Sequence, residues 1–231
     1  MRRVAAVTAV AVCLLSVVAC SEDEAEGPAR VLLVGDSVMN QTAQPLRRFL
    51  AADVDVRNEA VNGSGLLTPW RFDWPAHLDR VLTSFEPDVV VFLFVGNYTF
   101  GGDQRYTTED GTVIRRRGTP AFFEAWQREA AAMTEAVGEA EVIWVLPPPM
   151  RGRRAQAVVE GLREGYEAVA DGDDSATTVD AYDVLARDGR FIARASGEDG
   201  VRLRAGDGVH LAPRGARRLA GLIEDAVDTV A

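Results

Sequence analysis

The chain has too few cysteines for a disulfide framework or a cysteine-based metal site. Its 231 residues include two cysteines, Cys13 and Cys20. Cys13 lies in an N-terminal apolar segment that we expect to be removed, so a mature chain would keep Cys20 alone. A single cysteine has no partner for an intramolecular disulfide, and it cannot supply the several thiolates of a cysteine-based metal site.

The chain also lacks the excess of basic residues that a nucleic-acid-binding protein needs. It has 25 Lys and Arg against 35 Asp and Glu, which gives a formal net charge of −10 at pH 7. Nucleic-acid binding requires a basic face, so we expect no nucleic-acid partner. The apolar content of 47% and the charged content of 26% are those of an ordinary globular protein. The length suits one domain, and no internal repeat is visible.

The N-terminus has the pattern of a secretory signal. Arg2 and Arg3 precede an apolar segment, residues 4–18, that is shorter than a membrane-spanning helix requires. The sequence Val17-Val18-Ala19-Cys20 resembles the lipobox of bacterial lipoproteins. This resemblance implies cleavage before Cys20 and lipidation of that cysteine, and an ordinary signal peptide cut nearby is the alternative.

The lipobox interpretation divides the chain into three parts. Residues 1–19 are the expected lipoprotein signal peptide, and residues 20–29 are an acidic, aperiodic tether that follows lipidated Cys20. Residues 30–231 are expected to form a single domain. We expect the mature protein to be secreted and anchored to the outer face of the cytoplasmic membrane, with the lipid as its sole membrane contact.

Strands and helices alternate along the expected domain. Apolar runs and short alternating segments predict strands at residues 31–34, 54–56, 89–95, 141–146 and 177–179. Apolar residues at helical spacing predict helices at residues 41–52, 74–84, 120–137, 153–170 and from 213 onward. Residues 98–119 are expected to form a long loop with a hairpin at Asp110-Gly111. The alternation predicts a parallel sheet covered by helices on both faces.

The stretch Val31 to Asn40 is the most informative one. Four apolar residues run into Gly35-Asp36-Ser37, and a helical pattern follows. Ser37 therefore falls at the carboxyl end of a buried parallel strand, where open α/β sheets bind their ligands. Such a serine can cap the following helix, or it can act as a nucleophile if another part of the chain supplies a base.

Other strand ends and loops carry the groups that such a nucleophile needs. His210 can act as the base, and Asp207, three residues earlier, can hold the imidazole in the correct tautomer. The backbone N–H groups of Ser37 and Gly65 and the side-chain amide of Asn97 can donate hydrogen bonds to an oxyanion. Because the carboxyl ends of parallel strands meet at one edge, these residues can converge there.

The four blocks that contain these residues resemble those of the SGNH (GDSL-type) hydrolase family. They are Gly35 to Ser37, the Gly65 of Asn62-Gly63-Ser64-Gly65, Gly96-Asn97 and Asp207 to His210, in the family's order. The match covers nearly the whole mature chain. It implies a three-layer α/β/α sandwich with a mostly parallel, flavodoxin-like five-stranded sheet. It also implies serine-dependent hydrolysis of acyl esters or amides, without a metal or another cofactor.

The third block departs from the family pattern. The family usually has Gly-x-Asn-Asp, whereas Asn97 here follows Gly96 directly and Tyr98 comes next. The asparagine still lies at a strand end, so its expected oxyanion role is retained. In the second block, we assign the oxyanion role to Gly65 rather than to Gly63.

Several conspicuous residues have ordinary structural explanations. His77 has no visible partner and is expected to be structural or at the surface. Asp36 is expected to bind backbone in the turn. The aromatic residues near Gly65 are expected to pack in the core, with stacking on a sugar ring as the alternative; they are Trp70, Phe72 and Trp74. Arg202 and Arg204 alternate, so we expect them to share one face and one of them to contact substrate or brace the Asp207 loop.

The sequence thus predicts a lipid-anchored serine esterase. The expected substrates are acylated small molecules or, by preference, short-chain O-acyl (O-acetyl) esters of a cell-envelope or extracellular glycan. Two alternatives remain open. One is an O-acyltransferase that passes the same acyl group from Ser37 to a sugar hydroxyl, and the other is a non-catalytic glycan-binding lipoprotein. The sequence does not predict the oligomeric state.

Overall fold

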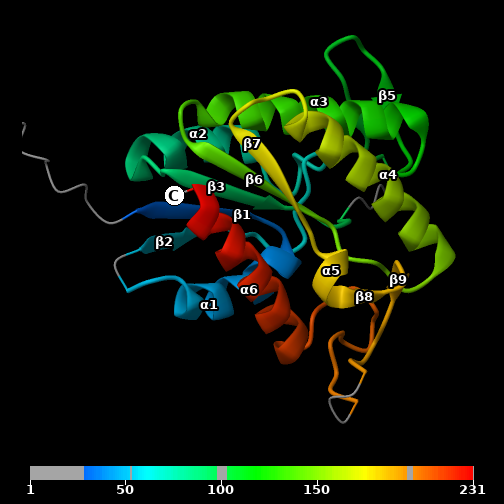
Figure 1. The fold of residues 1–231 in the computed structure, drawn as a ribbon. Helices are drawn as coiled ribbons and strands as arrows, with labels where there is room; N and C mark the ends of the chain where they lie inside the picture. Colours follow the sequence, from blue (N-terminus) through cyan, green and yellow to red (C-terminus); the bar gives the residue numbers. More distant parts are fainter. Residues whose placement is uncertain (1–28, 53, 98–102, 197–199, 231) are drawn as a thin grey trace, which may run out of the picture.

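The computed structural model describes residues 29–52, 54–97, 103–196 and 200–230. The predicted signal peptide, the lipidation site Cys20 and all but the last residue of the tether lie outside these ranges. The centre of the described chain is a parallel sheet with the strand order β2-β1-β3-β6-β7 (Figure 1). Its strands are β1 (Arg30–Gly35), β2 (Asp55–Asn58), β3 (Val89–Leu93), β6 (Glu141–Leu146) and β7 (Ala176–Asp180). This is the order of flavodoxin-like doubly wound sheets.

Helices cover both faces of the sheet. On one side lie α1 (Ser37–Phe49), the short α5 (Tyr182–Leu185) and α6 (Pro213–Val230); on the other lie α2 (Trp74–Phe85), α3 (Pro120–Val137) and α4 (Arg153–Ala170) (Figure 1). A hydrophobic core lies on each face of the sheet, and successive residues of β1 belong to opposite cores. Val31 and Leu33 face α1 and α6, whereas Leu32 and Val34 face α2 and α3. A strand buried on both faces needs a continuous apolar run. The predicted three-layer α/β/α sandwich with a five-stranded parallel sheet is confirmed.

Strand β3 ends two residues earlier than the sequence predicts. Phe94 and Val95 remain buried, but their N–H groups leave the sheet ladder. The Phe94 N–H donates to the Tyr166 hydroxyl of α4 (2.9 Å), and the Val95 N–H donates to the Asp36 carboxylate (2.8 Å). The end of β3 is thereby tied to α4 on one side and to the β1–α1 turn on the other.

Helix starts follow the capping residues of the sequence. Asp73 caps α2, and Thr119 caps α3 with Pro120 at the first position, as predicted. Helix α1 begins at Ser37, four residues before the predicted start. The reason is that Asp36, rather than Ser37, is the N-cap, since the Asp36 carboxylate accepts the Val38 N–H.

Two small hairpins lie outside the central sheet. Strands β4 (Tyr106–Thr107) and β5 (Val113–Ile114) form the hairpin predicted around Asp110-Gly111; residues 98–102 of the same expected loop are outside the described residues. Strands β8 (Ala186–Arg187) and β9 (Arg190–Phe191) form the second. Within the described ranges, none of the helices has the length and apolar character needed to cross a membrane.

Gly35, the last residue of β1, has no room for a side chain. A Cβ atom there would lie 2.1 Å from the Leu93 carbonyl oxygen and 2.8 Å from the Met39 Cβ. We expect Gly35→Ala to lower the free energy of unfolding by about 3 kcal/mol, at the upper end of overpacking costs, because backbone must shift. In the control Gly206→Ala the new methyl group meets open space, and its effect should stay within about 1 kcal/mol. Urea unfolding measures both; equal effects would contradict the close β1–β3 approach.

Candidate active site

Ser37 lies at the point where the sheet changes winding direction. Strands β1 and β3 are neighbours, but the chain continues from β1 into α1 on one face and from β3 toward α3 on the other (Figure 1). In open α/β sheets, the crevice at such a switch point binds the ligand. Ser37 follows β1 and Asn97 follows β3, so both predicted site residues stand at this switch point.

The structure brings Ser37, His210 and Asp207 into one hydrogen-bonded line. The Ser37 Oγ lies 2.9 Å from the His210 Nε2, and the His210 Nδ1 lies 2.6 Å from the Asp207 Oδ2. The other Asp207 oxygen, Oδ1, accepts the backbone N–H groups of Val209 (2.9 Å) and His210 (3.0 Å). Asp207 therefore fixes both the imidazole and the backbone of the loop that carries it.

The Asp207 carboxyl is ionised throughout the neutral range. The hydrogen bond from His210, helped by the two backbone N–H groups, lowers the pKa of Asp207 to about 2. An ionised carboxylate can only accept, so it selects the tautomer with hydrogen on Nδ1 and leaves the Nε2 lone pair facing the Ser37 hydroxyl. The side chains of His210 and Asp207 are 39% and 48% exposed, so the site is open to solvent.

Asp36 is fully buried beneath this line and joins three elements. Its Oδ1 accepts the Val38 N–H of α1 (2.9 Å), and its Oδ2 accepts the Val95 N–H (2.8 Å) and the Asn97 side-chain N–H (3.1 Å). Burial raises the pKa of the Asp36 carboxyl to about 6, although the N–H donors oppose that shift. The predicted backbone contact in the turn is present, and Asp36 additionally orients Asn97.

Asn97 and Gly65 are both tied to the β1–α1 turn. A side-chain amide has two N–H groups, so that of Asn97 can hold Asp36 with one and donate to a ligand with the other. The loop that carries Gly65 is attached to β1, because the Val61 N–H donates to the Gly35 carbonyl (2.8 Å). Thr68 holds the Gly65 carbonyl, to which its N–H (3.1 Å) and its hydroxyl (2.9 Å) both donate.

A buried arginine supports the loop that carries His210. Arg204 is 1% exposed, and its guanidinium donates to the carbonyls of Val209 (2.8 Å) and Pro149 (2.6 Å). Burial lowers the pKa of Arg204 to about 10, so the group stays charged at neutral pH. Arg202 is exposed, so the expectation that both arginines share one face is wrong. They bridge to different partners, Arg202 to Arg194 and Arg204 to Leu211, and the chain does not continue as one regular strand.

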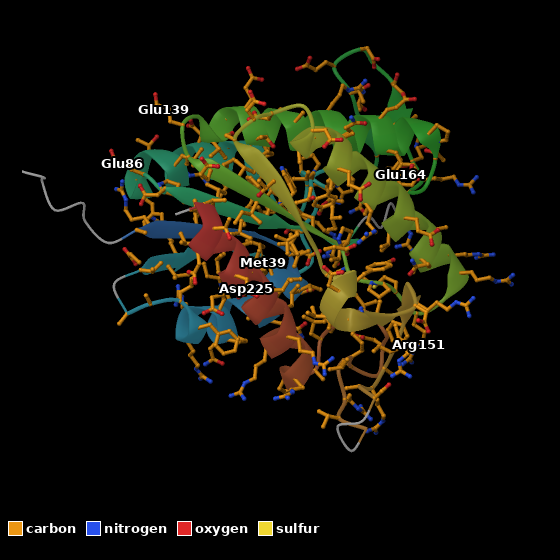
Figure 2. All side chains as sticks on the ribbon, in the orientation of Figure 1. Met39, Glu86, Glu139, Arg151, Glu164 and Asp225 are labelled. Atoms are coloured by element: carbon orange, nitrogen blue, oxygen red, sulfur yellow. The ribbon has the colours of Figure 1, made fainter. Side chains whose placement is uncertain are left out.

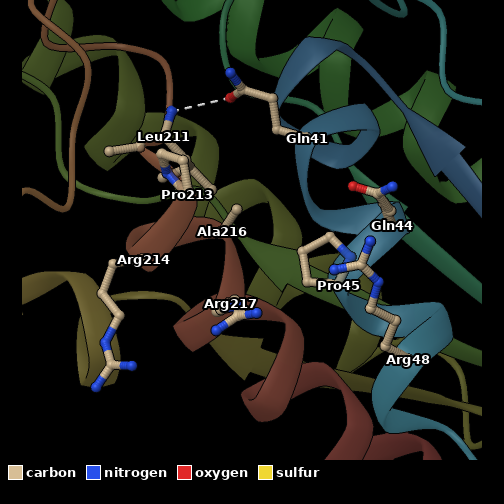
Figure 3. Close-up of a pocket in the computed structure, with 10 residues that line it drawn as sticks. Gln41, Gln44, Pro45, Arg48, Leu211, Pro213, Arg214, Ala216 and Arg217 are labelled. Atoms are coloured by element: carbon tan, nitrogen blue, oxygen red, sulfur yellow. Dashed lines mark hydrogen bonds between the residues drawn. The ribbon is translucent and has the colours of Figure 1, made fainter.

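Gln41 is a site residue that the sequence analysis missed. Its side-chain oxygen accepts the Leu211 N–H at 2.9 Å, directly after His210 (Figure 3). Gln41 lies one helical turn after Ser37, on the same side of α1. That i, i+4 spacing from a proposed nucleophile was the available signal, but the contact joins residues 170 positions apart, and the sequence cannot show it.

His77 has a structural role, as one of the two predicted alternatives, and it has a partner that was not visible in the sequence. Its Nε2 lies 2.8 Å from the Glu59 carboxylate, which follows β2, and its ring lies edge-on to Phe72 and Trp74. The sequence did not reveal this contact because the two residues belong to different elements. Trp74 is 1% exposed, which confirms the core interpretation for that residue, and Phe72 packs against the same core.

Within the described ranges, no group of three or more His, Cys, Asp or Glu is placed to hold a metal ion. Both histidines instead bind a single carboxylate each, His77 that of Glu59 and His210 that of Asp207. The expectation that the protein needs no metal or other cofactor stays a prediction.

Residues 30–226 match the family described as "Protein of unknown function (DUF459)". The chain belongs to this family. The matched range contains every predicted site residue of the DUF459 chain except the lipidation site. A comparison with curated proteins finds no match.

The DUF459 chain is similar to many solved structures of SGNH and GDSL-type hydrolases. A GDSL-like lipase from Bacteroides thetaiotaomicron is 15% identical, with a TM-score of 0.60 over 88% of this chain and 90% of that one. The catalytic domain of peptidoglycan O-acetyltransferase A from Streptococcus pneumoniae is 16% identical (TM-score 0.56, 89% and 96% covered). A carbohydrate esterase of family 3 from Talaromyces cellulolyticus is 17% identical (TM-score 0.59, 87% and 97% covered). These likenesses confirm the predicted SGNH-hydrolase fold.

The buried Asp36 carboxyl makes stability depend on pH. Because its folded-state pKa of about 6 lies above the unfolded value near 4, Asp36 stabilises the fold below about pH 4 and loses this contribution as the pH rises through 6. Relative to Asp36→Asn, the wild type should therefore lose on the order of 2–3 kcal/mol of unfolding free energy between about pH 4 and pH 7.5.

Urea unfolding of both proteins at the two pH values measures this change. The exposed Asp228→Asn serves as the control for loss of an Asp elsewhere. If the gap between wild type and Asp36→Asn is the same at both pH values, the buried carboxyl does not titrate in this window.

Proposed function

We propose that the protein is a serine esterase that hydrolyses O-acyl esters through an acyl-serine intermediate. The observation that carries this proposal is the line from Ser37 through His210 to Asp207, with distances of 2.9 and 2.6 Å. A serine hydroxyl becomes a nucleophile when a base accepts its proton and a carboxylate orients that base. The SGNH-hydrolase fold supports the same assignment.

The proposed reaction has two symmetrical halves. The Ser37 Oγ attacks the acyl carbonyl while the His210 Nε2 takes the hydroxyl proton, and Asp207 stabilises the imidazolium. Collapse of the tetrahedral intermediate breaks the bond to the alcohol, which leaves with the proton from His210. A water molecule then attacks the acyl-serine and loses a proton to His210. The second tetrahedral intermediate breaks the bond to the Ser37 Oγ, which regains its proton from His210 as the carboxylic acid leaves.

The proposed oxyanion donors are the backbone N–H groups of Ser37 and Gly65 and the side chain of Asn97. Two observations support this set. Asp36 holds the Asn97 amide by one N–H (3.1 Å), and the Gly65 loop is bonded to the last residue of β1. Donors that are fixed before the reaction stabilise the developing charge without reorganisation.

The proposed substrate is a short-chain O-acyl ester, by preference an O-acetyl ester of an extracellular or cell-envelope glycan. Two solved structures with this fold are a peptidoglycan O-acetyltransferase and a carbohydrate esterase. The half-exposed His210 and Asp207 suit a bulky polymer that approaches from solvent. We further propose that the lipid on Cys20 holds the enzyme at the outer face of the cytoplasmic membrane, near such glycans.

Acyl transfer to a sugar hydroxyl is a second candidate, favoured by the likeness to the O-acetyltransferase domain. Water and a sugar hydroxyl are alternative acceptors for one acyl-serine. Mass spectrometry of the products with and without an oligosaccharide acceptor separates the two. An acylated oligosaccharide supports transfer, and release of free acid alone supports hydrolysis.

Substitution of the three aligned residues tests the proposed function. We expect Ser37→Ala and His210→Ala to reduce kcat for 4-nitrophenyl acetate at least 10³-fold, with a substantial loss in Asp207→Asn, because each removes a member of one proton-transfer unit. His77→Ala removes the other described histidine and should retain near wild-type activity once folded. Wild-type rates in folded Ser37→Ala would overturn the assignment.

Arg204 is a positioning residue, and its test needs a kinetic readout. Arg204→Lys keeps the charge but loses the planar fork that reaches two carbonyls, so the His210 loop should loosen. We expect kcat to fall about tenfold with little change in KM, because a misplaced group affects the transition state more than substrate binding. The exposed Arg202→Lys is the matched control. A change confined to thermal stability would assign Arg204 a structural role alone.

A further inference from the structure

A groove of about 610 Å³ runs between α1 and α6, beside the aligned Ser37 and His210. Helix α1 contributes Gln41, Gln44 and Arg48, and the start of α6 contributes Arg214 and Arg217, with Leu211 between the helices (Figure 3). The hydrogen bond from the Leu211 N–H to Gln41 lies at the end of the groove nearest to His210 (Figure 3). The groove therefore begins next to His210, at Leu211 and Gln41.

The lining of this groove is basic in an acidic protein. Arg48, Arg214 and Arg217 are exposed, and none of the described residues that line the groove is Asp or Glu. The chain as a whole has a formal net charge of −10. Exposed acidic side chains such as Glu86, Glu139 and Glu164 belong to the α2–α4 layer on the other side of the sheet (Figure 2). The groove lining is therefore positively charged, while exposed acidic residues of the same layer, such as Asp225 and Asp228, lie further along α6 (Figure 2).

Two of the groove arginines lie near the amino end of α6. Arg214 is the second residue of the helix and Arg217 the fifth, and the first turn has no acidic residue. The helix macrodipole places partial positive charge at this end, so cations there are unfavourable. The position of Arg48 is no evidence for a bound anion, because Arg48 lies at the carboxyl end of α1, where a cation is favourable. An anion bound in the groove would lie near the amino end of α6, where negative charge is favourable.

The size of the groove sets the kind of ligand. Along α1, Gln41 is four residues and Arg48 eleven residues from Ser37, which corresponds to about 6 and 16 Å of helix. A small acyl ester at Ser37 cannot reach across this distance. A ligand that places an ester at Ser37 and an anion between Arg48 and Arg217 must be an oligomer that extends away from the reacting bond.

We propose that this groove binds carboxylate or phosphate groups of an acidic oligosaccharide whose O-acyl ester lies at Ser37. The guanidinium fork matches both oxyanions with paired hydrogen bonds. The inference rests on the proposed esterase function, and it narrows the substrate from glycans in general to anionic ones.

The test compares wild type with Arg48→Gln/Arg217→Gln. The control is Arg154→Gln, which removes an exposed arginine near the start of an 18-residue helix on the opposite face of the sheet. Two measurements are made on each protein. One is the ratio of kcat/KM for O-acetylated oligogalacturonides, or O-acetylated phospho-oligomannosides, to kcat/KM for neutral O-acetylated xylo-oligosaccharides. The other is calorimetric binding of the unacetylated acidic oligosaccharides.

We expect the ratio to favour one acidic substrate in the wild type and to fall at least tenfold in the double variant, mainly through KM. It should also fall between 50 and 300 mM NaCl, because salt screens exposed charges. The better acidic ligand distinguishes carboxylate from phosphate. Binding weakened equally by Arg154→Gln, or no preference for either acidic ligand, would overturn the proposal. Binding tests the groove without catalysis, so an inactive enzyme that still binds acidic oligosaccharides through Arg48 and Arg217 would refute the esterase alone.

Discussion

The site depends on one buried carboxylate. Asp36 starts α1 by accepting the Val38 N–H, ends β3 by accepting the Val95 N–H, and orients Asn97 through its side chain. Removing these oxygens would leave buried donors unpaired, which is more costly than losing an exposed contact. Because Ser37 directly follows Asp36, one group fixes both the proposed nucleophile and a proposed oxyanion donor. The raised pKa of Asp36, about 6, reflects the cost of burying this charge.

The loop that carries His210 is held by contacts that do not involve Asp36. Asp207 binds the imidazole, Arg204 binds the Val209 carbonyl from beneath, and Gln41 receives the Leu211 N–H from α1. These contacts come from the loop itself, a buried cation and the helix that begins at Ser37. The Gln41 bond is therefore a second connection between nucleophile and base, beyond the one between their reacting atoms. The groove beside it shares this framework, so binding there can align a substrate with Ser37.

Most of the fold could be predicted because its signals are local. Continuous apolar runs marked the buried strands, and Asp73 and Thr119 marked helix starts through bonds to residues within the next turn. Asp207 and His210 were recognisable because they lie three residues apart and follow a family motif. The contacts of Arg204, Gln41 and His77 could not be predicted, since each joins elements distant in the sequence. The early end of β3 had the same cause, because its last N–H groups bind α4 and Asp36.

The central claim is that Ser37 is an activated nucleophile, and intact-mass analysis after treatment with a fluorophosphonate tests it most directly. The protein from Ser21 onward should gain the mass of one adduct at neutral pH. The adduct should be absent in Ser37→Ala and should form much more slowly in His210→Ala, because the base no longer accepts the serine proton. A folded wild-type protein that gains no adduct, or a Ser37→Ala variant that still gains it, would contradict the account.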